Sequence, residues 1–388
     1  MPAPQVYLDH AATTPVDPRV LAAILPYFSE TFGNPSSVHT YGQRADAAIE
    51  AARAGVASIV GCTPSEIVFT GCGSESDNLA LRGAAFAERQ RRGADTLLLS
   101  PVEHPAVLRT ARQLEQRFGF RIEWLHVDEY GRVAPEELRA RLSPQAAVVS
   151  IVYANNEIGS LNPIAALAAA CREMRVPFHT DAVQAASQLP IDVRVLGVDL
   201  LALGAHKFYG PKGVGALYRR EGLDLLPWMT GGGQEHGLRA GTHNVPLIVG
   251  LAEALRLTAL EREQRNAHMA PLRDRVIRGV LELIPEAALT GHPTERLPNH
   301  ASFVIRGVEA NALLAALDLE GFACSSGSAC KSGAPEPSEI LLAIGLPPAL
   351  ALSSLRVTVG KDTLLDEIDR FLDVLPRTVE RVRRLGAR

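Results

Sequence analysis

Short apolar runs alternate with longer amphipathic stretches from about residue 15 onward. Runs of this length predict strands, and the stretches with helical periodicity between them predict helices. The candidate strands cover residues 66–70, 96–100, 121–125, 146–152, 198–203 and 214–218, and the candidate helices include residues 42–60 and 77–92. Strands and helices that alternate in this way are typical of a parallel or mostly parallel α/β sheet.

The pattern changes near residue 260. A long charged helix is predicted over about residues 248–283, and a strand-like segment at 301–305 precedes further helix, loop and strand. The chain shows neither an internal repeat nor a low-complexity linker. We therefore expect a large domain at residues 15–260 and a smaller α+β domain made of residues 1–14 and 261–388, with the boundary inside a long helix.

The composition argues against several classes of function. Of the 388 residues, 47% are hydrophobic and 21% are charged, and the formal net charge of −4 gives no basic excess for nucleic-acid binding. No apolar stretch reaches membrane-spanning length, and the N-terminus lacks the pattern of a secretory signal. Five scattered cysteines do not suggest a disulfide framework. We expect a cytoplasmic protein with reduced thiols that binds neither nucleic acid nor a membrane.

The strongest chemical signal is a lysine between two predicted strands. Lys207 lies in the segment AHKFYGPKG at 205–213, where glycine and proline favour a compact turn. An amine on a buried turn has a lowered pKa and is therefore nucleophilic, although a single loop lysine more often points to water. Asp181 ends an apolar segment at 176–181, and strand ends of an α/β sheet meet at the edge where ligands bind. A lysine and an acid at that edge fit pyridoxal 5′-phosphate (PLP), which needs an amine for its aldehyde and an acid beside its ring nitrogen.

A glycine-containing turn precedes the predicted helix at 77–92. The segment TGCGSESDN at 70–78 follows a strand and opens a helix, so its backbone amides and the helix dipole favour an anion. Gly73 permits close backbone approach, whereas Ser74 also fits the spacing of a helix cap with Asp77. The third glycine of a dinucleotide fingerprint and the Walker pattern are both missing, which leaves a simple phosphate site as the interpretation.

A second reactive group is a cysteine in a stretch of small residues. The segment ACSSGSACKSGAPEPS at 323–338 predicts a mobile loop, and an accessible thiolate on such a loop is reactive. A flexible loop of about ten residues spans roughly 16–19 Å, enough for Cys330 to carry a group from a pocket to the surface. Cys324 ends a strand-like segment and is expected to be buried and inert. No paired cysteine or histidine ligands lie nearby in the sequence, so we expect no metal.

Several further segments, together with these, resemble those of one family, the group I (NifS/IscS-like) cysteine desulfurases of the class V aminotransferases. The further segments are YLDHAATTP at 7–15, FGNPSSVH at 32–39, VEHPAV at 102–107, YANNEIG at 153–159 and GGGQEHGLRAGTH at 231–243. The resemblance runs nearly from end to end and keeps the order of the motifs. It implies a PLP-dependent fold of type I, similar to aspartate aminotransferase, with a mostly parallel seven-stranded sheet in the large domain and a smaller α+β domain.

The resemblance implies a set of residues that contact PLP. They are Gly73, Ser74, His104, Asn155, Asp181, Gln184, His206, Lys207 and Thr242. His104 would stack on the ring and move protons, although such a histidine alone is more often a residue at a helix start that bonds the backbone. Thr242 would reach the phosphate in a second subunit, which implies a homodimer. At Gly204 the family usually has serine or threonine, so we expect one phosphate hydrogen bond fewer and weaker retention of the cofactor.

The resemblance also implies how L-cysteine reacts. Substrate contacts would come from Asn34, His39, Asn155 and Arg356, although 32–39 alone also fits a polar connection between helices. Lys207, His104 and Cys330 would be catalytic: Lys207 removes the Cα proton, and the Cys330 thiolate attacks the substrate sulfur. L-Alanine would leave, and Cys330 would carry the persulfide to a sulfur-acceptor protein for iron–sulfur cluster assembly, tRNA thiolation or a related pathway.

Three other functions remain open on the sequence. A selenocysteine lyase or a cysteine/cystine lyase shares the lysine site, and Cys330→Ala would distinguish it because a lyase would still release selenide. An aminotransferase or decarboxylase of this fold is less expected, because neither reaction would use the Cys330 thiol. A non-catalytic sulfur-relay or assembly subunit would keep the fold but lack the yellow colour of bound PLP. Scaffold-dedicated family members often continue with a polar tail beyond the position of Arg388, so we do not expect an iron–sulfur scaffold to dock in that manner.

Overall fold

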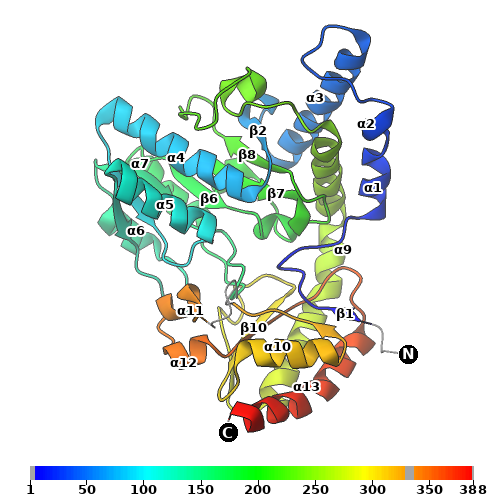
Figure 1. Cartoon of the computed structure of the whole chain (residues 1–388). Helices are drawn as coiled ribbons and strands as arrows, with labels where there is room; N and C mark the ends of the chain where they lie inside the picture. Colours follow the sequence, from blue (N-terminus) through cyan, green and yellow to red (C-terminus); the bar gives the residue numbers. More distant parts are fainter. Residues whose placement is uncertain (1–4, 328–335, 387–388) are drawn as a thin grey trace.

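A computed structural model describes residues 5–327 and 336–386 of the chain, so the predicted nucleophile Cys330 lies outside the described residues. Figure 1 shows two lobes, an upper one built on a central sheet and a lower one near which both chain ends lie. No helix among the described residues is both long enough and apolar enough to cross a bilayer.

A seven-stranded sheet forms the centre of the large lobe. Its strands, in spatial order, are β2 (Ile67–Thr70), β8 (Gly215–Arg219), β7 (Leu200–Gly204), β6 (Phe178–Asp181), β5 (Ala146–Ser150), β3 (Thr96–Leu99) and β4 (Arg121–Trp124). Strand β8 runs antiparallel to β2 and β7, and the other neighbouring pairs are parallel. The mostly parallel seven-stranded sheet predicted from the sequence is therefore confirmed.

Helices cover both faces of this sheet. Successive strand side chains point to opposite faces, so Val68 and Leu97 belong to one hydrophobic cluster and Ile67 and Leu98 to another. The first cluster includes α4 (Gly73–Arg92) and α5 (Pro105–Phe118), and the second includes α3 (Thr40–Val60), α7 (Ile164–Glu173) and the first part of α9 (Val245–Leu283). The shorter helices of this lobe are α1 (Pro18–Ile24), α2 (Pro26–Ser29), α6 (Pro135–Arg141) and α8 (Val193–Leu196). Burial on both faces explains why the strands are continuously apolar.

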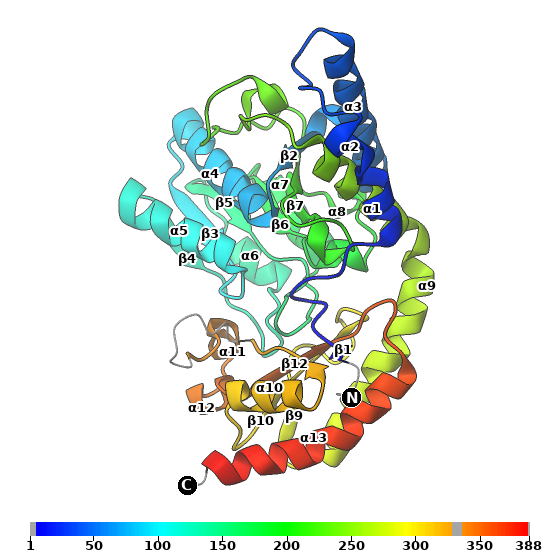
Figure 2. The same ribbon diagram turned by 45° about the vertical axis from the view of Figure 1, so that its right-hand side comes forward.

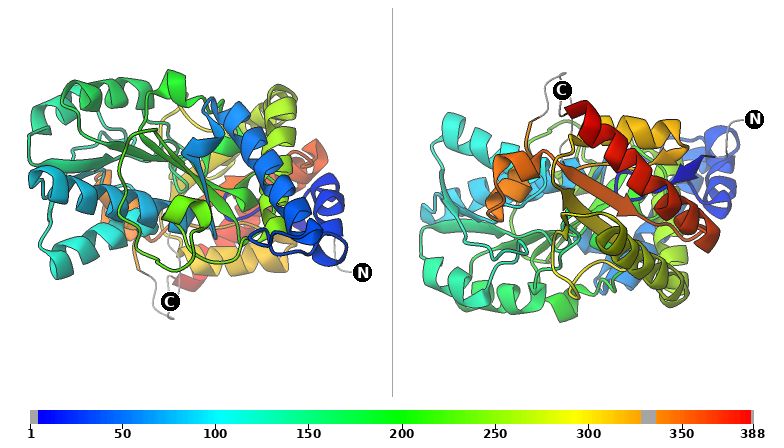
Figure 3. Two further views of the ribbon diagram at one scale, coloured as in Figure 1. Left: turned by 90° about the horizontal axis from the view of Figure 1, so that it is seen from above. Right: turned by 90° about the horizontal axis from the view of Figure 1, so that it is seen from below.

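The small lobe combines two short sheets with helices. Its three-stranded sheet has the order β12 (Ser354–Thr358), β10 (His300–Ile305) and β9 (Ala287–Leu289), and its two-stranded sheet pairs β1 (Val6–Tyr7) with β11 (Phe322–Ala323). The helices are α10 (Ala310–Leu319), α11 (Glu339–Ala343), α12 (Pro348–Ala351) and α13 (Leu365–Gly386). Seen from below, α13 in red crosses the outer side of this lobe (Figure 3).

The core of the small lobe includes the N-terminal segment. Val6 and Leu8 pack in one cluster with residues between Met269 and Val382, apart from the clusters around the large sheet. Figure 2 shows α9 running from the upper lobe into the lower one. The N-terminal segment thus packs with the small lobe, and the division into residues 15–260 and residues 1–14 with 261–388 stays a prediction.

Candidate active site

A cavity of about 190 Å³ lies where β6 and β7 end, beside the first turn of α4. Seven of the predicted cofactor residues line it: Gly73, Ser74, His104, Asp181, Gln184, His206 and Lys207. A larger hollow of about 890 Å³ lies near the opposite ends of these strands and contains none of the predicted site residues. The chemically distinctive side chains therefore gather at the carboxyl edge of the sheet, where ligands of α/β proteins bind.

Lys207 lies in the loop that connects β7 to β8. Its Nζ donates hydrogen bonds to the carbonyl oxygens of Ala11, at 2.6 Å, and Ala12, at 2.7 Å. Burial, followed by the positive charge of Arg356, lowers the pKa of Lys207 to about 8, although Asp181 acts in the opposite direction. A substantial fraction of this amine is therefore neutral near pH 8, which is the form that acts as a nucleophile or base.

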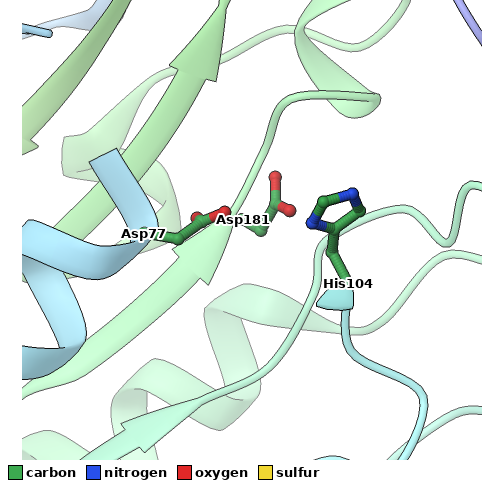
Figure 4. Close-up of side chains that lie close together, drawn as sticks. All are labelled: Asp77, His104 and Asp181. Atoms are coloured by element: carbon green, nitrogen blue, oxygen red, sulfur yellow. The ribbon is translucent and has the colours of Figure 1, made fainter. Parts of the chain in front are cut away.

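Asp181 is the last residue of β6, next to β7. Its Oδ1 accepts a hydrogen bond from the amide of Val183 at 2.8 Å. Figure 4 shows Asp77 and His104 close by, and each of the three side chains offers an atom within 4.8 Å of the others. Burial raises the pKa of both carboxyl groups. The charge of Asp181 raises the pKa of Asp77 further, whereas His104, the amide of Val183 and Lys207 act to lower that of Asp181, so we assign the proton to Asp77 and the negative charge to Asp181. A protonated Asp77 is a poor metal ligand, whereas an ionised Asp181 suits a protonated ring nitrogen.

The first turn of α4 forms the phosphate side of the cavity. The helix begins at Gly73 with Cys72 in the N-cap position, so Ser74 lies inside the first turn and is not the cap that its spacing also allowed. A Cβ atom on Gly73 would lie 2.6 Å from Val183, and glycine is therefore required for this close approach. Amides at the start of a long helix are suited to an anion.

His206 and His104 line the cavity and have different partners. The ring of His206 bonds Thr13 Oγ1 through Nδ1 at 3.1 Å, and burial together with nearby positive charge lowers the pKa of His206 to about 4. His104 caps α5, because its Nδ1 accepts from the amide of Ala106 at 3.1 Å. Accepting at Nδ1 leaves a ring proton of His104 on Nε2. The capping role and a role toward the cofactor are therefore compatible.

The N-terminal segment 9–14 packs across the site, which the sequence predicted only as a loop. Gln184 Nε2 donates to the carbonyl of Ala11 at 2.8 Å, the same carbonyl that Lys207 bonds. Thr14 Oγ1 donates to the carbonyl of His206 at 3.0 Å. The segment thus holds the lysine loop in place, although no local pattern indicates this.

The two asparagines after β5 differ from the expectation. Asn155, predicted to contact both PLP and substrate, is 1% exposed and does not line the cavity. Its Nδ2 donates to the carbonyl of Val102 at 2.8 Å, and its Oδ1 accepts from the amides of Glu157 and Ile158. Asn156 lines the cavity instead. In this arrangement Asn155 shapes the turn, and its contact with ligands stays a prediction that depends on its second N–H.

Arg356 lies on β12 of the small lobe and faces the same region. Its Nη2 bonds Asp9 Oδ1 at 2.8 Å, and its Nη1 donates to the carbonyl of Asn156 at 2.9 Å. Its Nε is buried without a partner among the described residues. An incoming carboxylate would therefore share this guanidinium with Asp9.

Besides Asn155 and Arg356, three further predicted residues do not line the cavity of their own chain. Asn34 and Thr242 line a separate hollow of about 500 Å³ with Phe28 and Phe32. His39 caps α3, where its Nδ1 accepts from the amide of Gly42 at 3.3 Å. The single chain thus does not bring these three side chains to Lys207.

A buried ion pair that the sequence analysis missed holds the loop that carries Thr242. Arg53 forms two hydrogen bonds of 2.8 Å with Glu235, and His243 bonds the same carboxylate at 2.7 Å. The amide of Phe69 donates to it at 2.9 Å. Glu235 has a positive φ of 49°, so these bonds stabilise an unfavourable backbone conformation.

We expect Arg53→Ala to destabilise the fold by about 3–5 kcal/mol, because the Glu235 charge would be buried without its partner.

Burial raises the pKa of Glu235, but hydrogen bonds from Arg53 and His243 bring it down to about 2. Because the pKa of Glu235 is lower in the folded state, the ionised carboxylate stabilises the fold at pH values above the ordinary pKa of 4.5. This stabilisation is lost as the pH falls toward the folded-state pKa of about 2. Denaturant midpoints measured between neutral pH and about pH 2.5 should fall less steeply in Glu235→Gln than in the wild type; equal slopes would contradict the assignment.

The lysine, the acid on the neighbouring strand and the helix N-terminus together define one class of enzyme fold. The family model for class-V aminotransferases matches residues 6–371, and the chain belongs to this family. Cysteine desulfurase IscS of Methanosarcina thermophila is 45% identical over 98% of this chain and 93% of its own length. A solved NifS-like protein is 35% identical with a TM-score of 0.90, covering 97% of this chain and 99% of its own. The structure of SspA in complex with cysteine is 34% identical with a TM-score of 0.80, covering 92% of this chain and 99% of its own.

Proposed function

We propose that this protein is a PLP-dependent cysteine desulfurase that takes sulfur from L-cysteine and leaves L-alanine. The desulfurase activity predicted from the sequence is confirmed by relatives of that name, such as the one from Methanosarcina thermophila, which match 98% of the chain. The single structural observation that carries the proposal is the meeting of Lys207, Asp181 and the start of α4 in one cavity.

The described residues fit PLP at three points. The amides at Gly73 and Ser74 would hold its phosphate, Asp181 would bond its ring nitrogen, and Lys207 would bind its aldehyde. Gly73 and Ser74 both line the cavity at the start of α4, and the amides of a helix N-terminus are suited to a phosphate. When bound, PLP supplies an electron sink for a carbanion at the substrate Cα.

The residues around the cavity supply binding and proton transfer. The neutral amine of Lys207 takes the Cα proton, and the Asp181 carboxylate supports positive charge on the ring nitrogen. Arg356 binds the substrate carboxylate, since its guanidinium is held in place by Asp9 and the carbonyl of Asn156. His104 lines the cavity with a proton on Nε2, and it would contact the ring of PLP and move protons there.

Cys330 would take the sulfur, and the described chain before it pairs with the strand that carries Arg356. Ser325 pairs with Arg356 through backbone hydrogen bonds of 2.7 and 3.2 Å. After Cys330, the described chain resumes at residue 336, and Ser338 bonds the carboxylate of Glu157. The Cys330 thiolate would attack the substrate sulfur as the bond between that sulfur and the substrate Cβ breaks, and Cys330 would then carry a persulfide. Its outer sulfur would pass to a sulfur-acceptor protein, such as an iron–sulfur scaffold or a tRNA-thiolation protein.

A homodimer would bring the remaining predicted residues to the site. Phe28 and Phe32 are 58% and 63% exposed, and they line the same hollow as Asn34 and Thr242. A second copy would cover this apolar surface and present Thr242 to the phosphate in its partner. Sedimentation should give a dimer, and Phe32→Asp should weaken both the dimer and the retention of PLP; a monomer with full PLP binding contradicts this part of the proposal.

Gly204 offers a test of the phosphate site. A Cβ at this position would lie 3.2 Å from Val183 and 3.5 Å from the amide nitrogen of Gly73. We expect Gly204→Ser to lower the dissociation constant of PLP by about 3–10-fold, because a hydroxyl there gains one charge-assisted hydrogen bond against some crowding. Gly204→Ala, which adds the Cβ alone, is the matched control in equilibrium dialysis. Equal affinities of the two variants would show that the hydroxyl does not reach the phosphate.

The activity is tested by measuring L-alanine and sulfide from L-cysteine in the presence of a reducing thiol. Equal amounts of the two products are expected. A cystine lyase would instead give products other than alanine, and a relay subunit would give none and would lack the visible absorbance of PLP. Either of these results overturns the proposed function.

A further inference from the structure

One carboxylate touches both ends of the segment that contains Cys330. Ser338 Oγ donates a hydrogen bond of 2.5 Å to Glu157 Oε2. On the other side of the segment, a Cβ placed on Gly327 would lie 2.5 Å from the same Oε2, so the backbone of Gly327 passes directly against this carboxylate. A larger residue at position 327 would collide with Glu157.

We infer that Glu157 is a positioning residue that clamps the two ends of the Cys330 segment, at Gly327 and at Ser338. The role of Cys330 itself rests on the proposed function. The clamp consists of described residues alone and holds independently of that role.

The side chain of Glu157 is not needed for the turn in which it lies. That turn is held by the side chain of Asn155, whose Oδ1 accepts from the amide of Glu157 at 2.8 Å. The carboxylate instead reaches across to the small lobe. Its position therefore calls for an explanation other than turn formation.

Each end of the segment is also tied to its own neighbours. Ser338 is the N-cap of α11, and its Oγ accepts from the amide of Leu341 at 3.2 Å while it donates to Glu157. The amide of Gly327 donates to Ser354 Oγ on β12 at 3.1 Å. Glu157 thus links the start of α11 to the strand that carries Arg356.

The charges around Glu157 make this link sensitive to protonation. Burial raises the pKa of Glu157 to about 7, while Ser338 and Arg356 act to lower it and Glu339 on α11 acts to raise it. Two further titratable groups lie near: Asp9, paired with Arg356, and His300, whose Nε2 faces the carbonyl of Asn156. Burial keeps His300 neutral by lowering its pKa. Glu157 is therefore the group expected to change charge near neutral pH, and its bond to Ser338 is stronger when it is ionised.

Hydrogen exchange of the PLP-loaded protein tests the clamp directly. Two sets of peptides report on the clamp: those that end near Gly327 and those that contain Leu341. After correction for intrinsic exchange rates, the protection of their amides against exchange should rise about ten-fold from roughly pH 6 to pH 8, the size expected for one charge-assisted hydrogen bond. Glu157→Gln keeps the shape and removes the charge, so its protection should be independent of pH. Glu339→Gln removes a carboxylate that raises the pKa of Glu157, so the rise in protection should remain but should occur at lower pH. The same slope in Glu157→Gln, or no slope in the wild type, overturns the inference.

Steady-state kinetics separate positioning from general damage. Glu157→Gln should lower kcat for alanine formation about ten-fold and leave both KM for L-cysteine and the PLP spectrum unchanged, because the thiol acts after cysteine has bound. Ser338→Ala should behave in the same way, whereas Ser338→Thr, which retains the hydroxyl, should restore kcat. A matching change in KM or in the spectrum would show that Glu157 acts on the cofactor cavity, against the inference. If the wild type forms no alanine, the proposed function fails, and the exchange experiment still decides the clamp.

Discussion

Cys330→Ala is expected to lower alanine formation from L-cysteine by about 10²–10⁴-fold, the range typical of losing a directly acting group. No persulfide should form on the peptide that contained the thiol. The visible absorbance of PLP and the binding of L-cysteine should be unchanged, because neither Lys207 nor Asp181 is altered. The effect is large because the variant lacks the group that would attack the substrate sulfur.

The other cysteines provide the control for this prediction. Cys324 is half-buried at the end of β11, and burial raises its pKa, so it is a poor nucleophile. Cys324→Ala should therefore retain wild-type turnover. Cys72 is exposed and lines the cavity, so peptide-resolved mass spectrometry must show which thiol carries the sulfur. A persulfide on Cys72, or full turnover in Cys330→Ala, would contradict the account.

Lys207→Ala should have the largest effect, a loss of roughly 10⁴-fold or more, because it removes both the covalent link to the cofactor and the base. The visible absorbance should shift toward that of free PLP, and the cofactor should be lost on dialysis. Lys212→Ala is the matched control, since Lys212 lies in the same loop but outside the cavity. Comparable losses in the two variants would show that the loop matters only for stability.

Much of the fold could be predicted because both faces of the large sheet are buried. Strands such as Leu200–Gly204 are continuously apolar, and their ends are marked by glycine or by a polar residue. The strand predicted at 146–152 ends at Ser150 because the amide of Val152 bonds the buried carboxylate of Glu103 at 2.6 Å. Helix α4 begins at Gly73, four positions before the predicted residue 77, because its glycine-containing start looks like a loop in sequence.

The site was predictable where it depends on neighbouring strands and unpredictable where it depends on distant contacts. Lys207 and Asp181 follow adjacent strands of one sheet, so their meeting follows from topology. The bond between Lys207 and Ala11 joins segments 196 residues apart, and the pair Arg53–Glu235 joins segments 182 residues apart. No local pattern shows such contacts. Similarly, the choice between Asn155 and Asn156 as the residue facing the cavity is decided by the turn that follows β5.

The central claim is that PLP is bound to the amine of Lys207. Reduction of the native protein with borohydride fixes such a link, and digestion followed by mass spectrometry locates it. The account predicts a pyridoxyl group on the peptide that contains Lys207 and on no other. A pyridoxyl group on a different lysine, or none on any peptide of the yellow protein, would contradict it.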